Sequence, residues 1–320
     1  MKIHRFIQTA VLVTIGLFSI SALRISETDQ IKVGKAPHYA IISPDGNSLF
    51  VTNFFSDEIS VIDLNTHQKK EPFYAGVQPL GIAITPAGDR ILVTNMRNGL
   101  VKVINARTHE ILDDIKVGDL PTNIVISPNG SQAFVTNYGR GAIGRIDFID
   151  IASHRDVDDL QVGVRPMAAV VSSQGDRLFV VCGGSNELYV IDTAAHKVIT
   201  QLPTGLAPDG MAISPDGNTL YIANSGSNDI SVVDLIDLKE TRRVKVGSNP
   251  FSMAVSSDGT IFVVETGSNT LSAFSPDWEK ITSVKVGKHP IDVKLSADGR
   301  WAYVTAELDN KVFVYQLTTD

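Results

Sequence analysis

Residues 33–53 read VGKAPHYAIISPDGNSLFVTN, and the order of features in this stretch recurs along the chain. A Gly-x-x-Pro entry is followed by an apolar run, by a turn that ends in glycine, and by a second apolar run that ends in asparagine. The entry recurs seven times, with glycines spaced 42, 42, 45, 42, 42 and 40 residues apart: Gly34, Gly76, Gly118, Gly163, Gly205, Gly247 and Gly287. A fixed period of this length indicates an array of one structural unit.

Each period holds four short apolar segments separated by turn residues. The third segment ends at an acid or amide, as in residues 61–63, and the fourth leads into the next glycine, as in residues 114–118. No segment shows the periodicity of an amphipathic helix. Four short strands in about 40 residues are typical of a propeller blade. The sequence therefore predicts an all-β fold, a seven-bladed β-propeller with four-stranded antiparallel blades.

The phase of the repeat predicts how the ring closes. A strand of the fourth type, near residues 30–33, precedes the first entry, and the chain finishes on a strand of the third type at residues 312–317. We expect the N-terminal strand to complete the last blade. Lysines such as Lys116 and Lys245 fall in the outermost strands, where charge discourages edge-to-edge association. We therefore expect a monomer.

The first 22 residues differ from the repeats. Two basic residues precede an apolar run over residues 6–23, which contains small residues near its end. This pattern is typical of an export signal, so we expect cleavage near Leu23 to leave residues 23–320 as a periplasmic or secreted propeller without stable membrane insertion. A membrane anchor is the alternative, because about 18 mostly apolar residues can span a bilayer.

The composition excludes several classes of function. The 320 residues are 43% hydrophobic and carry 28 basic against 35 acidic side chains, for a formal net charge of −7. This balance argues against a nucleic-acid partner, which would need a basic face. One cysteine, Cys182, excludes an internal disulfide and the two-thiol attachment of haem c. The sequence has no nucleotide-binding loop, dinucleotide fingerprint or Gly-x-Ser-x-Gly nucleophile, so we expect no nucleotide cofactor.

The repeated motifs resemble those of the YVTN-repeat propellers. The resemblance is carried by the Phe-Val-Thr-Asn strands at residues 50–53 and 134–137, by the Ser-Pro-Asp-Gly turns at residues 43–46 and 214–217, and by the Val-Gly-x-x-Pro entries. It covers about residues 29–320. That family occurs in exported bacterial proteins and archaeal surface-layer proteins and is related to lactonase-type propellers. The resemblance implies the fold and leaves the function open, because the family includes partner-binding and enzyme-like members.

Departures from the repeat near the propeller axis are the candidate functional residues. The entries and the loops after the Val-Thr-Asn strands should share one face, where side chains from several blades converge. Closure of the ring makes blades seven and one neighbours, so residues of both should meet there. The candidate ligand-binding residues at this channel mouth are His38, Tyr39, Asn123, Arg165, Asp209, Glu265, His289 and Asp292.

Some of these residues also have structural interpretations. Asp209 and Asp292 are equally suited to cap backbone amides of loops. Lys294 follows Asp292 by two residues on a strand, which predicts an ion pair between them. Cys182 replaces the usual asparagine at the end of a second strand, as Glu265 and Ala306 do in other blades, and is expected to be a small buried residue.

Histidines recur in the turn between the third and fourth strands of four successive blades. They are His67, His109, His154 and His196. These turns lie about 10 to 15 Å outside the innermost strands, so neighbouring copies diverge too far to share a metal ion. We interpret them as turn residues.

The favoured function is binding of a small-molecule ligand or a protein partner in the cell envelope through the entry face. The alternative is an enzyme at the same mouth, a lyase or lactone hydrolase assisted by a divalent metal ion. The candidate metal ligands are His38, His289, Asp292 and Glu265, because imidazole and carboxylate suit such an ion, and a second histidine would act as acid or base. A structural envelope component is a further alternative. The sequence does not decide whether the protein is an enzyme or which cofactor it uses.

Overall fold

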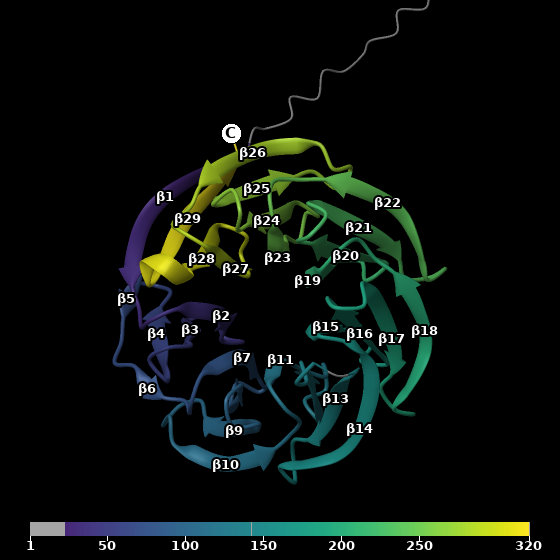
Figure 1. Cartoon of the computed structure of the whole chain (residues 1–320). Helices are drawn as coiled ribbons and strands as arrows, with labels where there is room; N and C mark the ends of the chain where they lie inside the picture. Colours follow the sequence, from purple (N-terminus) through teal and green to yellow (C-terminus); the bar gives the residue numbers. More distant parts are fainter. Residues whose placement is uncertain (1–22, 142, 320) are drawn as a thin grey trace, which may run out of the picture.

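Seven antiparallel sheets surround a central axis in the computed structural model, which describes residues 23–141 and 143–319 (Figure 1). The innermost strands each begin at the proline of an entry: β2 (Pro37–Ile42), β7 (Pro79–Ile84), β11 (Pro121–Ile126), β15 (Pro166–Val171), β19 (Pro208–Ile213), β23 (Pro250–Val255) and β27 (Pro290–Leu295). The second strands follow the glycine turns: β3 (Ser48–Asn53), β8 (Arg90–Asn95), β12 (Gln132–Asn137), β16 (Arg177–Cys182), β20 (Thr219–Asn224), β24 (Ile261–Glu265) and β28 (Trp301–Ala306).

The third and fourth strands complete each blade toward the rim. The third strands are β4 (Glu58–Asp63), β9 (Leu100–Asn105), β13 (Ile143–Asp150), β17 (Glu187–Asp192), β21 (Asp229–Asp234), β25 (Thr270–Phe274) and β29 (Lys311–Thr319). The outermost strands are β5 (Gln68–Lys69), β6 (Phe73–Tyr74), β10 (Ile111–Lys116), β14 (Arg155–Val164), β18 (Lys197–Pro203), β22 (Lys239–Lys245), β26 (Lys280–Lys285) and β1 (Leu23–Lys32). A short 3-10 helix, η1 (Glu307–Asp309), follows β28.

Blade one departs from the four-stranded plan at its outer edge. Its fourth strand is split into β5 and β6, which both pair with β4. Pro72 lies between the two pieces and has no N–H to donate to the ladder. The other blades confirm the predicted four-stranded antiparallel sheet, and the whole ring confirms the predicted seven-bladed propeller.

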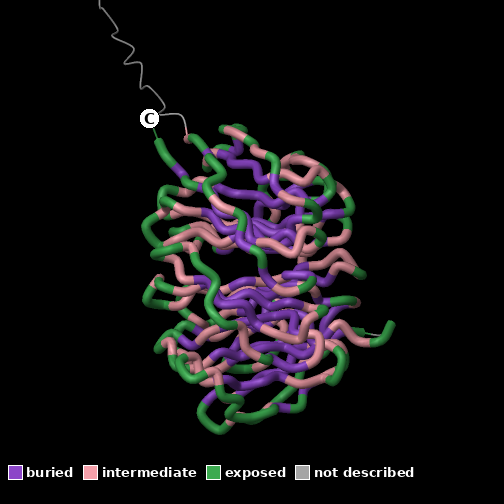
Figure 2. The backbone as a smooth tube through the Cα atoms, turned by 90° about the vertical axis from the view of Figure 1, so that its left-hand side faces the viewer, coloured by how far each residue is buried: buried purple, intermediate pink, exposed green. Residues whose placement is uncertain are grey.

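The hydrophobic core lies between the blades rather than within one central cluster. Each of the seven spaces between adjacent blades holds its own group of buried side chains. The second strands are buried on both faces, as in β3, whereas the rim strand β18 alternates between exposed and partly buried residues. Figure 2 shows the buried backbone inside the ring and the exposed backbone at the turns. Blades therefore depend on their neighbours for burial, as expected of repeat architectures.

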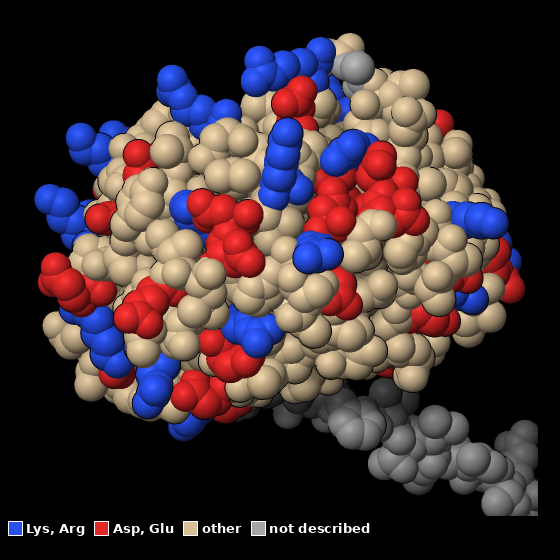
Figure 3. All heavy atoms as spheres, turned by 90° about the horizontal axis from the view of Figure 1, so that it is seen from below, with Lys and Arg blue, Asp and Glu red and all other residues tan. Residues whose placement is uncertain are grey.

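The outer rim carries charged side chains of both signs. Figure 3 shows this rim from the side of β10 and β14, where acidic and basic groups lie next to one another. In blade three, Arg145 lies 2.7 Å from Asp147, 3.8 Å from Asp156 and 3.6 Å from Asp159. Charged groups on outer strands hinder pairing with another sheet edge.

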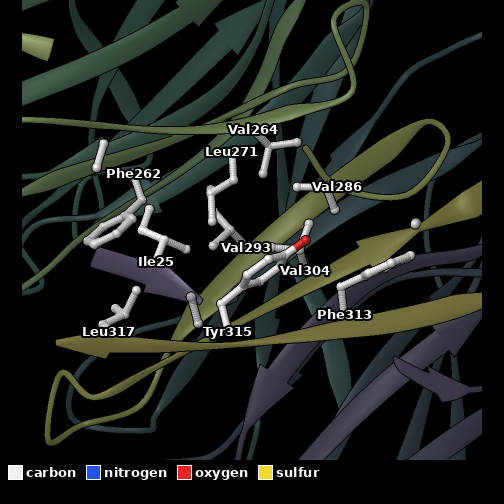
Figure 4. Packing of buried hydrophobic residues seen from close by; sticks show 13 residues of the cluster. Ile25, Phe262, Val264, Leu271, Val286, Val293, Val304, Phe313, Tyr315 and Leu317 are labelled. Atoms are coloured by element: carbon white, nitrogen blue, oxygen red, sulfur yellow. The ribbon is translucent and has the colours of Figure 1, made fainter. Parts of the chain in front are cut away.

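The ring closes by pairing between β1 and β29. Leu23 lies opposite Thr319 and Lys32 opposite Lys311, with a β-bulge near Glu27. This confirms the predicted closure. The N-terminal strand is longer than predicted, because its pairing starts at Leu23 rather than near residue 30. Figure 4 shows Ile25 of β1 beside Leu317 of β29 and Phe262 of blade six, so the N-terminal strand also seals the space between blades six and seven.

The expected export signal, residues 1–22, lies outside the described residues. Within residues 23–141 and 143–319, no helix is long and apolar enough to cross a membrane.

A protein that starts at residue 34 should be much less stable than one that starts at residue 23. The shorter protein loses the strand that buries Ile25 and Ile31, and each such side chain contributes about 1.5 to 3 kcal/mol when buried. We expect a melting temperature at least 10 °C lower by circular dichroism, or insoluble protein. Equal melting temperatures would show that β1 is not needed to close the ring.

Candidate functional site

The entries and the loops after the second strands lie on one face, here called the entry face. In every blade the residue after the second strand donates its backbone N–H to the residue that precedes the entry proline. Examples are Phe54 to Ala36 at 2.9 Å and Glu307 to His289 at 3.0 Å. This confirms the predicted common face and fixes the entry beside the loop.

Threonines in the second strands of blades one, two and seven join neighbouring blades beneath this face. Thr52 donates its hydroxyl to the carbonyl of Leu80 in the next blade at 2.8 Å, and Thr305 donates to the carbonyl of His38 at 2.7 Å. Each bond holds the second residue of an innermost strand, at the channel mouth. The preceding blade therefore positions this residue. The backbone of His38 is therefore fixed by blade seven.

In blades one to six, the residue that ends the second strand packs beneath the entry glycine. A Cβ on Gly76 would collide with Asn95, and the N–H of Gly205 donates to Asn224 at 3.1 Å. Blade six uses the same arrangement, because the N–H of Gly247 donates to Glu265 at 2.7 Å. Glycine is required at the entry because the crossover passes directly over this side chain.

Glu265 therefore lies inside blade six rather than at the channel mouth, where the sequence analysis expected it. Only 2% of it is exposed, and its second carboxylate oxygen accepts hydrogen bonds from Thr270 and Ser272 at 2.5 and 2.9 Å. These partners and the glycine N–H satisfy the buried charge. A glutamate at the asparagine position is thus an exchange of one structural acceptor for another.

The residue before each entry proline has a left-handed backbone. Arg165 has φ 59° and His289 has φ 55°, and the five corresponding residues of the other blades are also positive. Their backbone conformation is thus part of the repeat, while their side chains differ. The Arg165 guanidinium lies 4.9 Å from the centre of the Tyr138 ring, and Nδ1 of His289 lies 2.7 Å from Glu307.

Asp292 joins three blades at the channel wall. It is 1% exposed and accepts hydrogen bonds from the N–H of Ala40 at 3.0 Å and from the hydroxyl of Ser252 at 2.8 Å. The ammonium of Lys294 lies 2.9 Å away, which confirms the predicted ion pair. Asn123 acts in a similar way, because its side-chain oxygen accepts from the N–H of Ala169 in the next blade at 3.3 Å.

These residues line a chamber of about 460 Å³ in the channel, together with Asp209, Tyr39 and mostly apolar residues of the innermost strands. Burial raises the pKa of Asp209, although its hydrogen bond with Ser225 and the charge of Arg165 act in the opposite direction. Burial likewise raises the pKa of the Tyr39 phenol. The chamber therefore holds two different carboxylates. Asp292 is tightly paired, whereas the pKa of Asp209 is raised.

A second cavity of about 230 Å³ opens at the entry face, and we call it the aromatic funnel. It is largely apolar and is lined by His38, Tyr39, Phe54, Phe55, Leu80, Met96, Thr122, Tyr138, Met167, Phe251 and Glu307. Tyr39 and Phe251 line both cavities, so they stand between the chamber and the funnel. The charged residues Asp209, Asp292 and Lys294 line only the chamber.

His38 is the one funnel residue with a buried polar atom that lacks a hydrogen-bond partner among the described residues. Its ring packs edge-on against Tyr39 at 4.7 Å and Phe251 at 6.2 Å, and Nδ1 is the unpaired atom. Burial lowers the pKa of His38 to about 4, while the charge of Asp292 opposes the shift. The imidazole is therefore neutral at pH 7. An unpaired buried nitrogen is costly and suggests that a ligand supplies its partner.

Three further bulky residues of the funnel were not predicted from the sequence. Phe54, Met96 and Tyr138 each follow the asparagine that ends a second strand, in three successive blades. Blades four and five carry Gly183 and Ser225 at the same place. The sequence therefore does carry a signal for the funnel: the residue after the second strand is bulky in blades one to three and small in blades four and five.

The candidate metal ligands do not come together. Within residues 23–141 and 143–319, no group of three or more histidine, cysteine, aspartate or glutamate side chains is arranged to hold a metal ion. His289 pairs with Glu307, Asp292 pairs with Lys294, and Glu265 lies inside its blade.

The turn histidines and Cys182 lie where the sequence predicted. His109 and His196 have positive φ in their turns and stack on Phe73 and Phe148 of the preceding blade at 4.1 and 3.9 Å. They therefore add contacts between blades at the outer part of the ring. Cys182 is fully buried, and burial raises the pKa of its thiol to about 12.

The chain was compared with known proteins. Residues 167–307 match the family model described as the SMP-30/gluconolactonase/LRE-like region. The match covers less than half of the chain, from the innermost strand of blade four to η1. No curated protein matches the chain.

A solved structure resembles nearly the whole chain. It is Kuenenia stuttgartiensis hydrazine synthase, with a TM-score of 0.83 and 22% sequence identity over 92% of this chain and 98% of the other. At this identity the likeness shows the β-propeller fold alone.

Lowering the pH should destabilise the protein through His38. Its folded-state pKa of about 4 lies below the ordinary value of 6.5, so the unfolded chain binds the proton first as the pH falls through this range. The stability contributed by neutral His38 is present above pH 6.5 and is lost toward pH 4, by about 2 to 3 kcal/mol. Urea unfolding of the wild type and of His38→Gln at pH 7 and pH 4 measures this loss. Parallel losses in both proteins would contradict it.

Proposed function

We propose that the protein is a binding module whose aromatic funnel takes a ligand with an apolar or aromatic body. The buried, unpaired Nδ1 of His38 carries this proposal, because a ligand that hydrogen-bonds there would satisfy it. The surrounding Tyr39, Phe54 and Phe251 offer apolar and aromatic contact area. A small number of polar groups in a mostly apolar concave wall is the usual composition of a ligand site.

The interactions of the charged candidates favour binding over catalysis at this mouth. Asp292 and Glu265 are engaged by backbone N–H groups and by hydroxyls of neighbouring strands. Removing such partners would leave buried charge without compensation, so these carboxylates serve the scaffold. In the funnel, Thr122 and Glu307 are engaged in the same way, whereas the Nδ1 of His38 has no partner among the described residues.

The ligand or partner is proposed to lie in the cell envelope. This part of the proposal rests on the predicted export signal in residues 1–22.

Lactone hydrolysis is a second candidate, favoured by the match of residues 167–307 to the gluconolactonase-like family model. A divalent ion would need free carboxylate or imidazole ligands, and Asp292 and Glu265 do not offer them in this arrangement. We expect no metal-dependent hydrolysis of a sugar lactone above the buffer rate with Ca²⁺, Mn²⁺ or Zn²⁺. Acid release above that rate would favour this candidate over binding.

Binding of N-phenyl-1-naphthylamine, an uncharged fluorescent aromatic probe, should depend on the funnel. Phe54 and Phe55 line it, and Phe55 is 65% exposed, so replacing both by alanine removes contact area without opening the core. We expect affinity to fall about tenfold or more, as loss of two aromatic contacts implies. The measurement is a fluorescence titration of the purified protein.

The matched control is Ile236→Ala, which removes a 73% exposed side chain elsewhere on the surface. It should leave the affinity unchanged. Equal affinity in the wild type and in the Phe54→Ala, Phe55→Ala variant would overturn the proposed site.

A further inference from the structure

Two exposed arginines adjoin residues of the aromatic funnel: Arg165 contacts Tyr138, and Arg97 follows Met96 in the chain. We infer that the ligand is an amphipathic anion, with an apolar or aromatic body in the funnel and a carboxylate, sulfonate or similar anionic group held by Arg97 and Arg165. This inference rests on the proposed function and names the class of ligand that the same site would take.

Arg165 is placed by an aromatic side chain that itself lines the funnel. Its guanidinium carbon lies 4.9 Å from the centre of the Tyr138 ring, a distance typical of a cation–π contact. The side chain is exposed. A guanidinium presents paired N–H donors that suit the two oxygens of a carboxylate.

Arg97 follows the funnel residue Met96 in the loop between β8 and β9, at the position of the repeat that the funnel residue Phe55 occupies in blade one. It is exposed, and within residues 23–141 and 143–319 no carboxylate lies within ion-pair distance of it. Arg140, in the corresponding loop of blade three, lies 3.9 Å from Asp119. Arg97 therefore keeps its positive charge for a ligand, whereas Arg140 is partly compensated.

The carboxylates near this rim have partners of their own. Asp57 accepts the N–H of Gln78 at 2.9 Å, and Glu307, which lines the funnel, lies 2.7 Å from His289. Burial raises the pKa of Asp209, while the charge of Arg165 lowers it. In a chain with net charge −7, exposed cations beside an apolar cavity are a local reversal of charge that attracts an anion.

The size of the funnel favours a small molecule. About 230 Å³ is near the lower end of ligand pockets and suits a ring system or a short apolar chain. With His38 neutral in the funnel and the arginines at the rim, the ligand would place its apolar end inward and its charge outward. The anionic group stays partly hydrated in this orientation, which avoids the cost of burying a charge.

A pair of probes with the same aromatic body separates charge from apolar contact. N-phenyl-1-naphthylamine is uncharged, and 8-anilinonaphthalene-1-sulfonate carries a sulfonate on the same ring system. We expect the Arg97→Gln, Arg165→Gln variant to bind the sulfonate probe about fivefold to tenfold more weakly, as loss of two exposed charge contacts implies. The uncharged probe should keep its affinity within twofold. Raising the salt concentration should weaken only the sulfonate probe.

The control variant is Arg107→Gln, Arg242→Gln, which removes two exposed arginines away from the funnel. It should leave both affinities unchanged. Equal weakening of the two probes in the Arg97, Arg165 variant, or no weakening of either, would overturn the anionic ligand while leaving the funnel itself in place. Failure of the proposed function would give a different result. The affinity for the uncharged probe would then be the same in the wild type and in the Phe54→Ala, Phe55→Ala variant.

Discussion

Burial of apolar side chains between adjacent blades is the constraint on which the ring depends. Because each hydrophobic cluster lies between two blades, no blade can bury its apolar faces alone. Hydrogen bonds add to this contact in some blades. Thr52 and Thr94 donate to carbonyls of the following blades, and Thr305 does so across the closure to His38.

This constraint decides which polar residues remain free for function. Asp292 and Asn123 satisfy N–H groups of the next innermost strand, and Glu265 satisfies a crossover glycine. Such groups depart from the repeat in type but perform tasks that a propeller needs. Among the described residues that line the funnel, the buried Nδ1 of His38 is the polar atom that lacks a hydrogen-bond partner, and aromatic side chains surround it. The buried carboxylates at the channel therefore serve the scaffold, and the funnel is the better candidate for ligand binding.

The repeat was sufficient to predict the fold because its period, turns and apolar runs all agree. Blade number, strand order and closure follow from where the pattern begins and ends, and the ion pair of Asp292 with Lys294 follows from strand periodicity. Side-chain direction was harder to predict. Glu265 has the same chemistry as a ligand-binding residue, and only the position of the entry glycine above it shows that it faces inward. The apolar residues of the funnel were not predicted as a site, because apolar residues next to strands usually belong to the hydrophobic core.

The most direct test is whether a ligand contacts His38. A titration of the protein with 2-naphthol can be followed by the ¹⁵N chemical shifts of the histidine rings at pH 7, where His38 is neutral. Hydrogen bonding of the naphthol hydroxyl to Nδ1 should shift that nitrogen saturably, whereas the histidines of the turns, such as His109 and His196, should not respond. Saturable binding without a change at His38 would contradict the assignment of the funnel as the ligand site.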